Sequence, residues 1–259
     1  MLRTFSICPS SEQLGFDKSS SGPSRARANS HREPPTLVAV PRSIGADVTV
    51  WRVPHPGDYL GAGAVNALTK HDWAEIGALR NSAMRRRAFG VRIFLREALS
   101  AAIDNAVAPG DWRFGRTVYG KPYVANSSRN VEFSISHIDN ASFLAISRTV
   151  RVGIDVAAQS VDDWQEIAEE LFTLQERAML NRSPAAEREE VFLRIWTAKE
   201  AFAKLLGVGL AFDAPANDCG AGTHLATCGT NTPQGRVVIS LAVDRPVELR
   251  ERPSGQSAT

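Results

Sequence analysis

Length, composition and charge describe a chain that folds around an apolar core, because its 259 residues are 43% hydrophobic and 22% charged, far from the composition of disordered proteins. The 30 Lys and Arg residues against 28 Asp and Glu residues give a net charge of only +2, so charge alone makes no case for binding to nucleic acids or membrane surfaces. Cys8, Cys219 and Cys228 lack the spacing of zinc ligands, and no apolar run of about 18 residues is present, so we expect a cytoplasmic protein without disulfides or membrane segments.

The first 46 residues form a segment that differs from the rest. Residues 1–46 are rich in Ser, Pro and Arg and show little periodic hydrophobicity, which predicts a disordered tail. An organelle transit peptide is an alternative, although Glu12, Asp17 and Glu33 interrupt its expected pattern. Alternating apolar side chains over residues 47–53 then predict the first strand, which ends at Pro54.

Helices and strands follow in alternation along the chain. Apolar side chains recur at helical spacing over residues 71–103 and predict one or two amphipathic helices with a basic polar face. Residues 105–122 are rich in turn residues and predict a loop with a short strand at 112–114. Residues 131–137 and 142–147 predict a hairpin, and residues 152–156 predict a further strand.

The remaining elements complete a second half of similar size. Residues 162–182 and 187–206 have a helical pattern, with Gly207 placed to end the second helix. Residues 215–235 are rich in Gly, Ala and Thr, and a strand is predicted at 236–243. We therefore predict two comparable halves, 47–147 and 148–250, followed by a flexible C-terminus at 251–259.

Three acidic and basic side chains in this second half are candidates for chemistry. Glu200 and Lys204 lie one helical turn apart, opposite the apolar stripe of their helix. A solvated ion pair is the simplest interpretation, but such a pair can also hold a cation and a phosphate together. Asp155 lies in a strand, where a buried carboxylate needs a partner or an ion, and the alternative is a carboxylate facing water. Mg²⁺ would fit if Asp155 and Glu200 came together.

Candidate phosphate contacts come from the first half. His137 ends a predicted strand, where it could donate to a phosphate oxygen or be a satisfied structural residue. The first long helix carries five arginines, for which a phosphate pocket or a solvated face is favoured over nucleic acid, because no interleaved aromatic residues accompany them. They are Arg80, Arg85, Arg86, Arg87 and Arg92. No Walker, dinucleotide-binding or nucleophile-elbow sequence is present, which excludes those enzyme classes.

Four sequence blocks occur in a characteristic order. They are Gly120-Lys121-Pro122, Phe133-Ser134-Ile135-Ser136-His137, Val152-Gly153-Ile154-Asp155-Val156 and Trp196-Thr197-Ala198-Lys199-Glu200-Ala201, the last followed by Lys204 and Gly207. In this order and spacing they resemble the signature blocks of the Sfp-type 4′-phosphopantetheinyl transferases. The resemblance covers about residues 48–213.

The resemblance implies a fold and an activity. The fold is an α+β monomer of two similar halves, related by a pseudo-twofold axis, with coenzyme A in the cleft between them. The activity is Mg²⁺-dependent transfer of 4′-phosphopantetheine from coenzyme A to a serine of an apo acyl or peptidyl carrier protein, with release of adenosine 3′,5′-bisphosphate. Such carriers serve fatty-acid, polyketide or nonribosomal peptide synthesis. A non-catalytic relative that binds coenzyme A or a carrier protein is the alternative, and a nucleic-acid partner is not expected.

The resemblance also assigns roles to individual residues. Asp155 and Glu200 would hold the metal ion, and Glu200, Lys204 and His137 would act in catalysis. The contacts to coenzyme A would come from Arg80, Arg86, Arg92, Gly120, Lys121, Pro122, Ser136, His137, Lys199 and Lys204. One departure is Ala157, because many family members carry glutamate two residues after the metal-binding aspartate.

Overall fold

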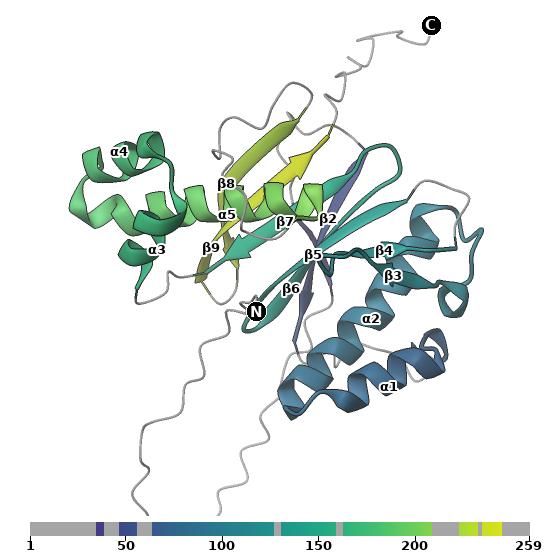
Figure 1. Ribbon diagram of the computed structural model, residues 1–259. Coiled ribbons are helices and arrows are strands. Elements are labelled where there is room, and N and C mark those ends of the chain that lie inside the picture. The colour runs from purple at the N-terminus through teal and green to yellow at the C-terminus, as the bar shows by residue number, and fades with distance from the viewer. Residues whose placement is uncertain are drawn as a thin grey trace, which may run out of the picture. The chain divides into compact units, whose positions relative to one another are not determined.

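Two larger antiparallel sheets, each covered by a long helix, form the centre of the part of the chain that the structure describes (Figure 1). The computed structural model describes residues 35–38, 47–55, 64–126, 131–158, 163–208, 223–232 and 235–244. All of these residues fall within the second of two units of the chain, Arg32–Thr259. The first sheet has the order β1 (Thr36–Val38), β2 (Val48–Pro54), β6 (Ala141–Ser147), β5 (Glu132–Ile138). The second has the order β7 (Val152–Ala157), β9 (Gly235–Val243), β8 (His224–Thr232).

Helices and a small hairpin connect these strands. The α-helices are α1 (Lys70–Ala78), α2 (Ser82–Ala102), α3 (Trp164–Leu171), α4 (Leu174–Arg182) and α5 (Arg188–Leu206). Short 3₁₀ turns are η2 (Ala64–Ala67), η3 (Pro109–Asp111) and η4 (Ala185–Glu187), and β3 (Phe114–Arg116) pairs with β4 (Pro122–Val124). None of the helices within the described ranges combines the length and the apolar character needed to cross a membrane.

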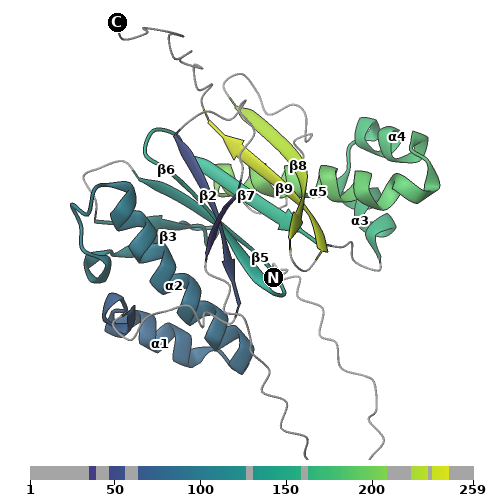
Figure 2. The ribbon, with the colours of Figure 1, turned by 180° about the vertical axis from the view of Figure 1, so that it is seen from behind.

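The two sheets and their helices stack in layers. Alternate side chains of β6 point to opposite faces of the first sheet: Phe143 belongs to a cluster with Ile154 of β7 and Ile239 of β9, whereas Leu144 packs with Leu99 of α2. On its other face, the second sheet packs against α5 through Val238 and Ala242 of β9. The order is therefore α2, first sheet, second sheet, α5, and Figure 2 shows the same arrangement from behind.

The same connectivity occurs twice. In the first half β2 leads through α1, α2 and the added small hairpin β3–β4 to the hairpin β5–β6, and in the second half β7 leads through α3, α4 and α5 to the hairpin β8–β9. In both cases the second hairpin strand lies in the middle, giving the orders β2-β6-β5 and β7-β9-β8. The α+β class is confirmed, and the repeated connectivity agrees with two similar halves.

The structure differs from the predicted elements in several places, one being β3, which lies two residues later than the strand predicted at 112–114. Thr36–Val38 pairs with β2, although residues 1–46 are predicted as a disordered tail, because the outer edge of β2 offers unpaired backbone groups to a β-prone Thr-Leu-Val segment. The rest of that tail, and residues 251–259, lie outside the described residues. The helix predicted at 162–182 is two helices, α3 and α4, because Thr173 and Glu176 cap the start of the second. β8 occupies part of the Gly-, Ala- and Thr-rich stretch, where no strand is predicted.

Candidate active site

The site begins at the line where β5 meets β7. Ser134 and Ser136 are buried on the same side of β5, and their hydroxyl oxygens accept the backbone N–H groups of Ile154 and Val156 at 3.1 and 3.2 Å. The two serine side chains thus join strands that belong to different sheets. Because Ile154 and Val156 face β5, the intervening Asp155 is held at a fixed place along this line.

Asp155 has two hydrogen-bond partners, one from β5 and one from α5. Its side chain is buried, with 7% of the residue exposed. The Ser136 hydroxyl donates to Asp155 Oδ1 at 2.8 Å, and Lys204 Nζ lies 2.7 Å from the same oxygen. The strand aspartate therefore has partners, as a buried carboxylate requires, and Ser136 is a positioning residue for it. The pair Lys204–Asp155 also joins α5 to β7 across the second half of the chain.

A glycine allows α5 to lie this close to β7. A Cβ atom on Gly153 would overlap the carbonyl oxygen of Ala201 and the backbone nitrogen of Leu205, and would lie 2.9 Å from Leu205 Cα. Only a residue without a side chain permits the contact. A second contact holds α5 against β9: the buried hydroxyls of Thr197 and Ser240 hydrogen-bond at 2.8 Å. Glu200 and Lys204 are thereby brought to Asp155.

Glu200 is placed where its charged form is disfavoured. Burial and repulsion from the Asp155 carboxylate raise the pKa of Glu200 to about 7, against the opposite effect of Lys204. The two carboxylates predicted to share a metal ion are therefore neighbours in the structure. A raised pKa caused by a second carboxylate is typical of paired acids in active sites.

His137 lies at the end of β5 with two polar neighbours of its own. Its Nδ1 is 2.6 Å from the Ser142 hydroxyl, whose oxygen is also 2.8 Å from His55 Nε2. His137 keeps exposed surface, yet partial desolvation and the positive charges of Arg87, His55 and Lys204 lower its pKa to about 3. The ring is therefore neutral near pH 7.

The arginines of α2 and of the residues just before it differ in their surroundings. Arg87 lies close enough to His137 and His55 for its charge to lower the pKa of both. Arg92 instead forms ion pairs with Asp72 and Glu75 of α1. Arg80 and Arg86 are exposed. The structure therefore brings Arg87 to the site, a residue that the sequence assignment of Arg80, Arg86 and Arg92 missed because the rotation of the helix is not set by an arginine-rich sequence.

Two predicted lysine contacts have structural partners in the described part of the chain. Lys199 is buried and its Nζ lies 3.1 Å from Glu176 Oε2 on α4, away from Asp155. Lys121 Nζ donates to the carbonyl oxygens of Leu205 at 3.1 Å and Val152 at 3.3 Å. Gly120, with φ of +88°, provides the turn before Lys121, and Pro122 begins β4. Contacts of Lys199 and of residues 120–122 with coenzyme A stay predictions.

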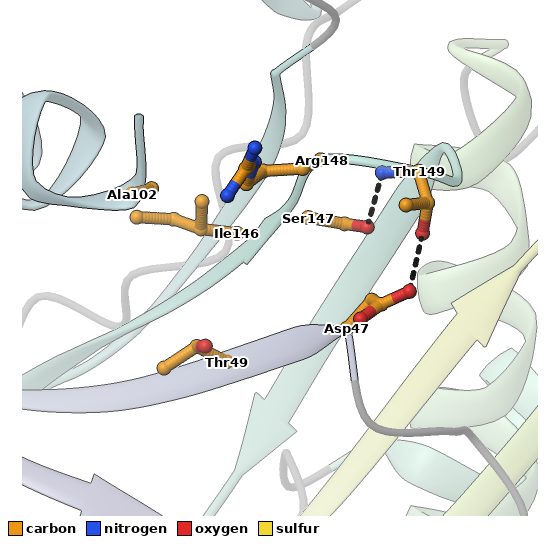
Figure 3. Close-up of a pocket in the computed structure, with 7 residues that line it drawn as sticks. All are labelled: Asp47, Thr49, Ala102, Ile146, Ser147, Arg148 and Thr149. Carbon is orange, nitrogen blue, oxygen red and sulfur yellow. Dashed lines mark hydrogen bonds between the residues drawn. The ribbon is translucent and has the colours of Figure 1, made fainter. Parts of the chain in front are cut away.

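A surface cavity of about 360 Å³ lies elsewhere (Figure 3). Asp47, Ser147 and Thr149 line it, and Thr149 Oγ1 donates to Asp47 Oδ2 at 3.3 Å. Ser147 is at the opposite end of β6 from Ser142, roughly 16 Å away at about 3.3 Å per strand residue. The cavity is therefore separate from the cluster around Asp155.

Ser142 and His55 are further site residues that the sequence analysis did not single out. Ser142 could have been noticed as a polar residue within a mostly apolar strand. His55 follows Pro54 at the end of β2, and no pattern distinguishes it. The site thus collects side chains from β5, β6, β7, α2, α5 and the end of β2.

Comparisons with known proteins point to one family. Residues 151–233, which include Asp155, Glu200 and Lys204, match the model of the 4′-phosphopantetheinyl transferase superfamily. The 4′-phosphopantetheinyl transferase HetI of Nostoc is 28% identical over 184 residues, covering 69% of this chain and 75% of the relative. The rat L-aminoadipate-semialdehyde dehydrogenase-phosphopantetheinyl transferase is 29% identical over 174 residues, covering 62% of this chain and 54% of the relative. The 4′-phosphopantetheinyl transferase gsp of Aneurinibacillus migulanus is 32% identical over 120 residues, 46% of each chain. The chain thus spans about half the length of the last two.

Proposed function

We propose that this chain, which matches the 4′-phosphopantetheinyl transferase superfamily over residues 151–233, transfers the 4′-phosphopantetheine group of coenzyme A to a serine of an apo acyl or peptidyl carrier protein. The serine oxygen would form a bond to the β-phosphorus, and adenosine 3′,5′-bisphosphate would leave. The observation that carries this proposal is the cluster of Asp155, Glu200 and Lys204, joined by a 2.7 Å ion pair and by the effect of Asp155 on the pKa of Glu200.

The acidic pair has the chemistry of a magnesium site. Mg²⁺ binds through one or two carboxylates together with substrate phosphates and water. The described residues contain no group of three or more His, Cys, Asp and Glu side chains placed to bind a metal, so Asp155 and Glu200 would hold Mg²⁺ with ligands from the diphosphate and water. When bound, the ion supplies positive charge to the phosphoryl oxygens. In the protein alone, Lys204 supplies the positive charge beside Asp155.

The residues of the chain itself account for positioning and proton transfer. A Glu200 with a pKa of about 7 is divided between its acid and carboxylate forms near neutral pH, so it can accept the proton of the attacking serine. Ser136 holds Asp155 in place, and Lys204, 31% exposed, can turn its charge to a phosphate. Catalysis of phosphoryl transfer then depends mainly on positioning and electrostatic stabilisation.

We further propose that the two halves with repeated connectivity are related by a pseudo-twofold axis, and that coenzyme A binds in the cleft between them. The repeated strand orders support the first part, and the junction of β5 with β7 supports the second, since the site residues collect there. A monomer is the expected state. Size-exclusion chromatography with light scattering tests it, and a stable dimer would contradict it.

A non-catalytic relative is the second candidate, favoured by Ala157. This residue lies two positions after Asp155, on the same side of β7, and packs against the apolar cluster between the second sheet and α5. A carboxylate expected there from the resemblance is therefore replaced by an apolar contact. Such a protein would bind coenzyme A without turnover.

The two candidates are separated by a transfer assay. The full chain is incubated with Mg²⁺, coenzyme A and a panel of apo carrier proteins, and the carriers are weighed by mass spectrometry. We expect at least one carrier to gain the phosphopantetheine mass, and Glu200→Gln to slow transfer by about 100-fold or more, as for loss of a general base. Glu190→Gln is the control, because Glu190 lies on the same helix and pairs with Arg194 and Arg236. Binding of coenzyme A with no modified carrier would support the non-catalytic relative instead.

A further inference from the structure

A buried serine lies between two histidines next to the proposed phosphate site. Ser142 has no exposed surface, and its hydroxyl lies 2.6 Å from His137 Nδ1 and 2.8 Å from His55 Nε2. In the first sheet Ser142 is paired with His137 of β5 and with Val53 of β2, two residues before His55. Three neighbouring strands therefore bring the three side chains together. A hydroxyl has one proton, so Ser142 can donate to only one of the two rings.

The backbone settles which ring receives it. His55 Nδ1 lies 3.3 Å from the carbonyl oxygen of Asp139, which can only accept, so Nδ1 carries a proton. Burial lowers the pKa of His55, and Arg87 and Arg52 lower it further, against the raising effect of the bond to Asp139. A neutral His55 with its proton on Nδ1 has an unprotonated Nε2, which must accept the hydroxyl proton of Ser142.

The remaining hydrogen bond is then determined. With its proton directed to His55, the Ser142 oxygen can only accept from His137, so His137 Nδ1 carries the proton of that ring. The Nε2 of a neutral His137 has a free lone pair. On this assignment, His137 Nε2 could donate to a phosphate oxygen only after it has taken up a proton.

We propose that Ser142 and His55 are positioning residues that fix the proton of His137 on Nδ1 and thereby present Nε2 as a proton acceptor to a phosphate group. The assignment of the tautomer stands alone, and the role toward phosphate rests on the proposed function. A phosphomonoester has a second pKa near 6, so its monoanion is available near neutral pH. Its P–OH proton would pass to Nε2, leaving an imidazolium beside a dianion, a charge-assisted hydrogen bond.

The charges around His137 fit this order of events. Arg87 of α2 and Lys204 of α5 lie near the ring, and their positive charges, together with that of His55 when it is protonated, disfavour an imidazolium on His137. A bound phosphate dianion would offset them. Binding of the ligand and uptake of a proton by His137 are therefore expected to occur together.

Histidine ¹⁵N NMR of the free full chain tests the tautomer. The protonated and unprotonated nitrogens of a neutral imidazole have well separated shifts, and we expect His137 to be protonated at Nδ1. In His55→Phe the Ser142 proton becomes free to bond with His137, so His137 should change to the Nε2–H form. Ser142→Ala should lose the single tautomer. Ser147→Ala, which removes a hydroxyl that is also buried in β6 and binds backbone N–H groups, should leave it unchanged.

The outcomes separate the two parts of the proposal. A wild-type His137 protonated at Nε2, or a His137 tautomer unaffected by His55→Phe, would overturn the assignment. Calorimetry of coenzyme A binding in buffers of different ionisation enthalpy then measures proton uptake, which should be lower in His137→Gln than in the wild type. Equal uptake in the two proteins would overturn the phosphate role. A chain that shows the Nδ1–H tautomer but does not bind coenzyme A would refute the proposed function and leave the tautomer assignment intact.

Discussion

At the scale of single residues, the site is governed by two neighbouring carboxylates, Asp155 and Glu200, and by the single ammonium group of Lys204 that lies beside them. Asp155 has both a hydroxyl and an ammonium donor at 2.8 and 2.7 Å on one oxygen, whereas Glu200 is the acid whose pKa is raised. Two neighbouring carboxylates cannot both ionise at low cost unless a cation is shared. The environment therefore separates their roles, with Asp155 held by its partners and Glu200 left able to exchange a proton.

The raised pKa of Glu200 predicts a pH dependence of stability in the metal-free protein. Between its ordinary value of 4.5 and about 7, the folded protein retains a proton on Glu200 that the unfolded chain has released. The free energy of unfolding should therefore fall as the pH rises through this range. Urea unfolding in the presence of a chelator, below and above the range, measures it. Glu200→Gln should lose less stability than the wild type over the same interval.

The histidines do not interfere with this comparison. The pKa values of His137 and His55 are lowered, so their effect is to raise the free energy of unfolding as the pH rises, opposite to the effect of Glu200. Both histidines are present in the wild type and in Glu200→Gln. The difference between the two profiles isolates Glu200. Identical pH profiles for the wild type and Glu200→Gln would contradict the raised pKa.

At the scale of secondary-structure elements, the contact of α5 with β7 decides the geometry of the site. Gly153 is the residue that permits it. Gly153→Ala should push the helix away from the strand and destabilise the fold by about 1–3 kcal/mol, as overpacking does. It should also slow transfer, because Glu200 and Lys204 move with the helix. Chemical denaturation and the carrier assay measure the two effects.

Gly77→Ala is the matched control. Gly77 lies in α1, where a Cβ would meet nothing within 4 Å, and the exchange of glycine for alanine in a helix stabilises it by roughly 0.5–1 kcal/mol. We expect unchanged transfer in this variant. A Gly153→Ala protein with wild-type stability and activity would show that α5 does not depend on this close approach.

Elements with a strong hydrophobic period were predictable from the sequence, and those defined by pairing or capping were not. The strand bearing Asp155 and the helix bearing Glu200 were found within a residue or two of their observed bounds. The break before Leu174 depends on a capping box, and β8 depends on pairing with β9, neither of which shows in periodicity. The same holds for side chains. The ion pair of Lys199 with Glu176 of α4 is not visible in the sequence, and the contact of Lys199 with coenzyme A stays a prediction.

At the scale of the whole molecule, the two halves are joined by polar side chains where backbone pairing stops. Ser134 and Ser136 reach from β5 to the backbone of β7. Lys121 reaches from the turn before β4 to the carbonyl oxygens of Val152, at the start of β7, and Leu205 of α5. The carbonyl of Leu205 is in the last turn of α5, where no later N–H group of the helix donates to it. These contacts allow a site to be built across two sheets.

The two carbonyl contacts of Lys121 predict a structural role, which differs from the contact with coenzyme A that the resemblance implies. Lys121→Met removes the donor to two carbonyl oxygens and should lower the free energy of unfolding by about 1–3 kcal/mol, while the Kd for coenzyme A stays near that of the wild type. Arg116→Met is the control, because Arg116 donates within its own hairpin, to the carbonyl of Gly120, and exposed substitutions of this kind change stability by about 0.5 kcal/mol or less. Denaturant unfolding and coenzyme A titration are measured on each variant. A Lys121→Met protein of unchanged stability with weakened coenzyme A binding would place Lys121 in the ligand site, because its ammonium would then act on the ligand and not on the junction between the halves.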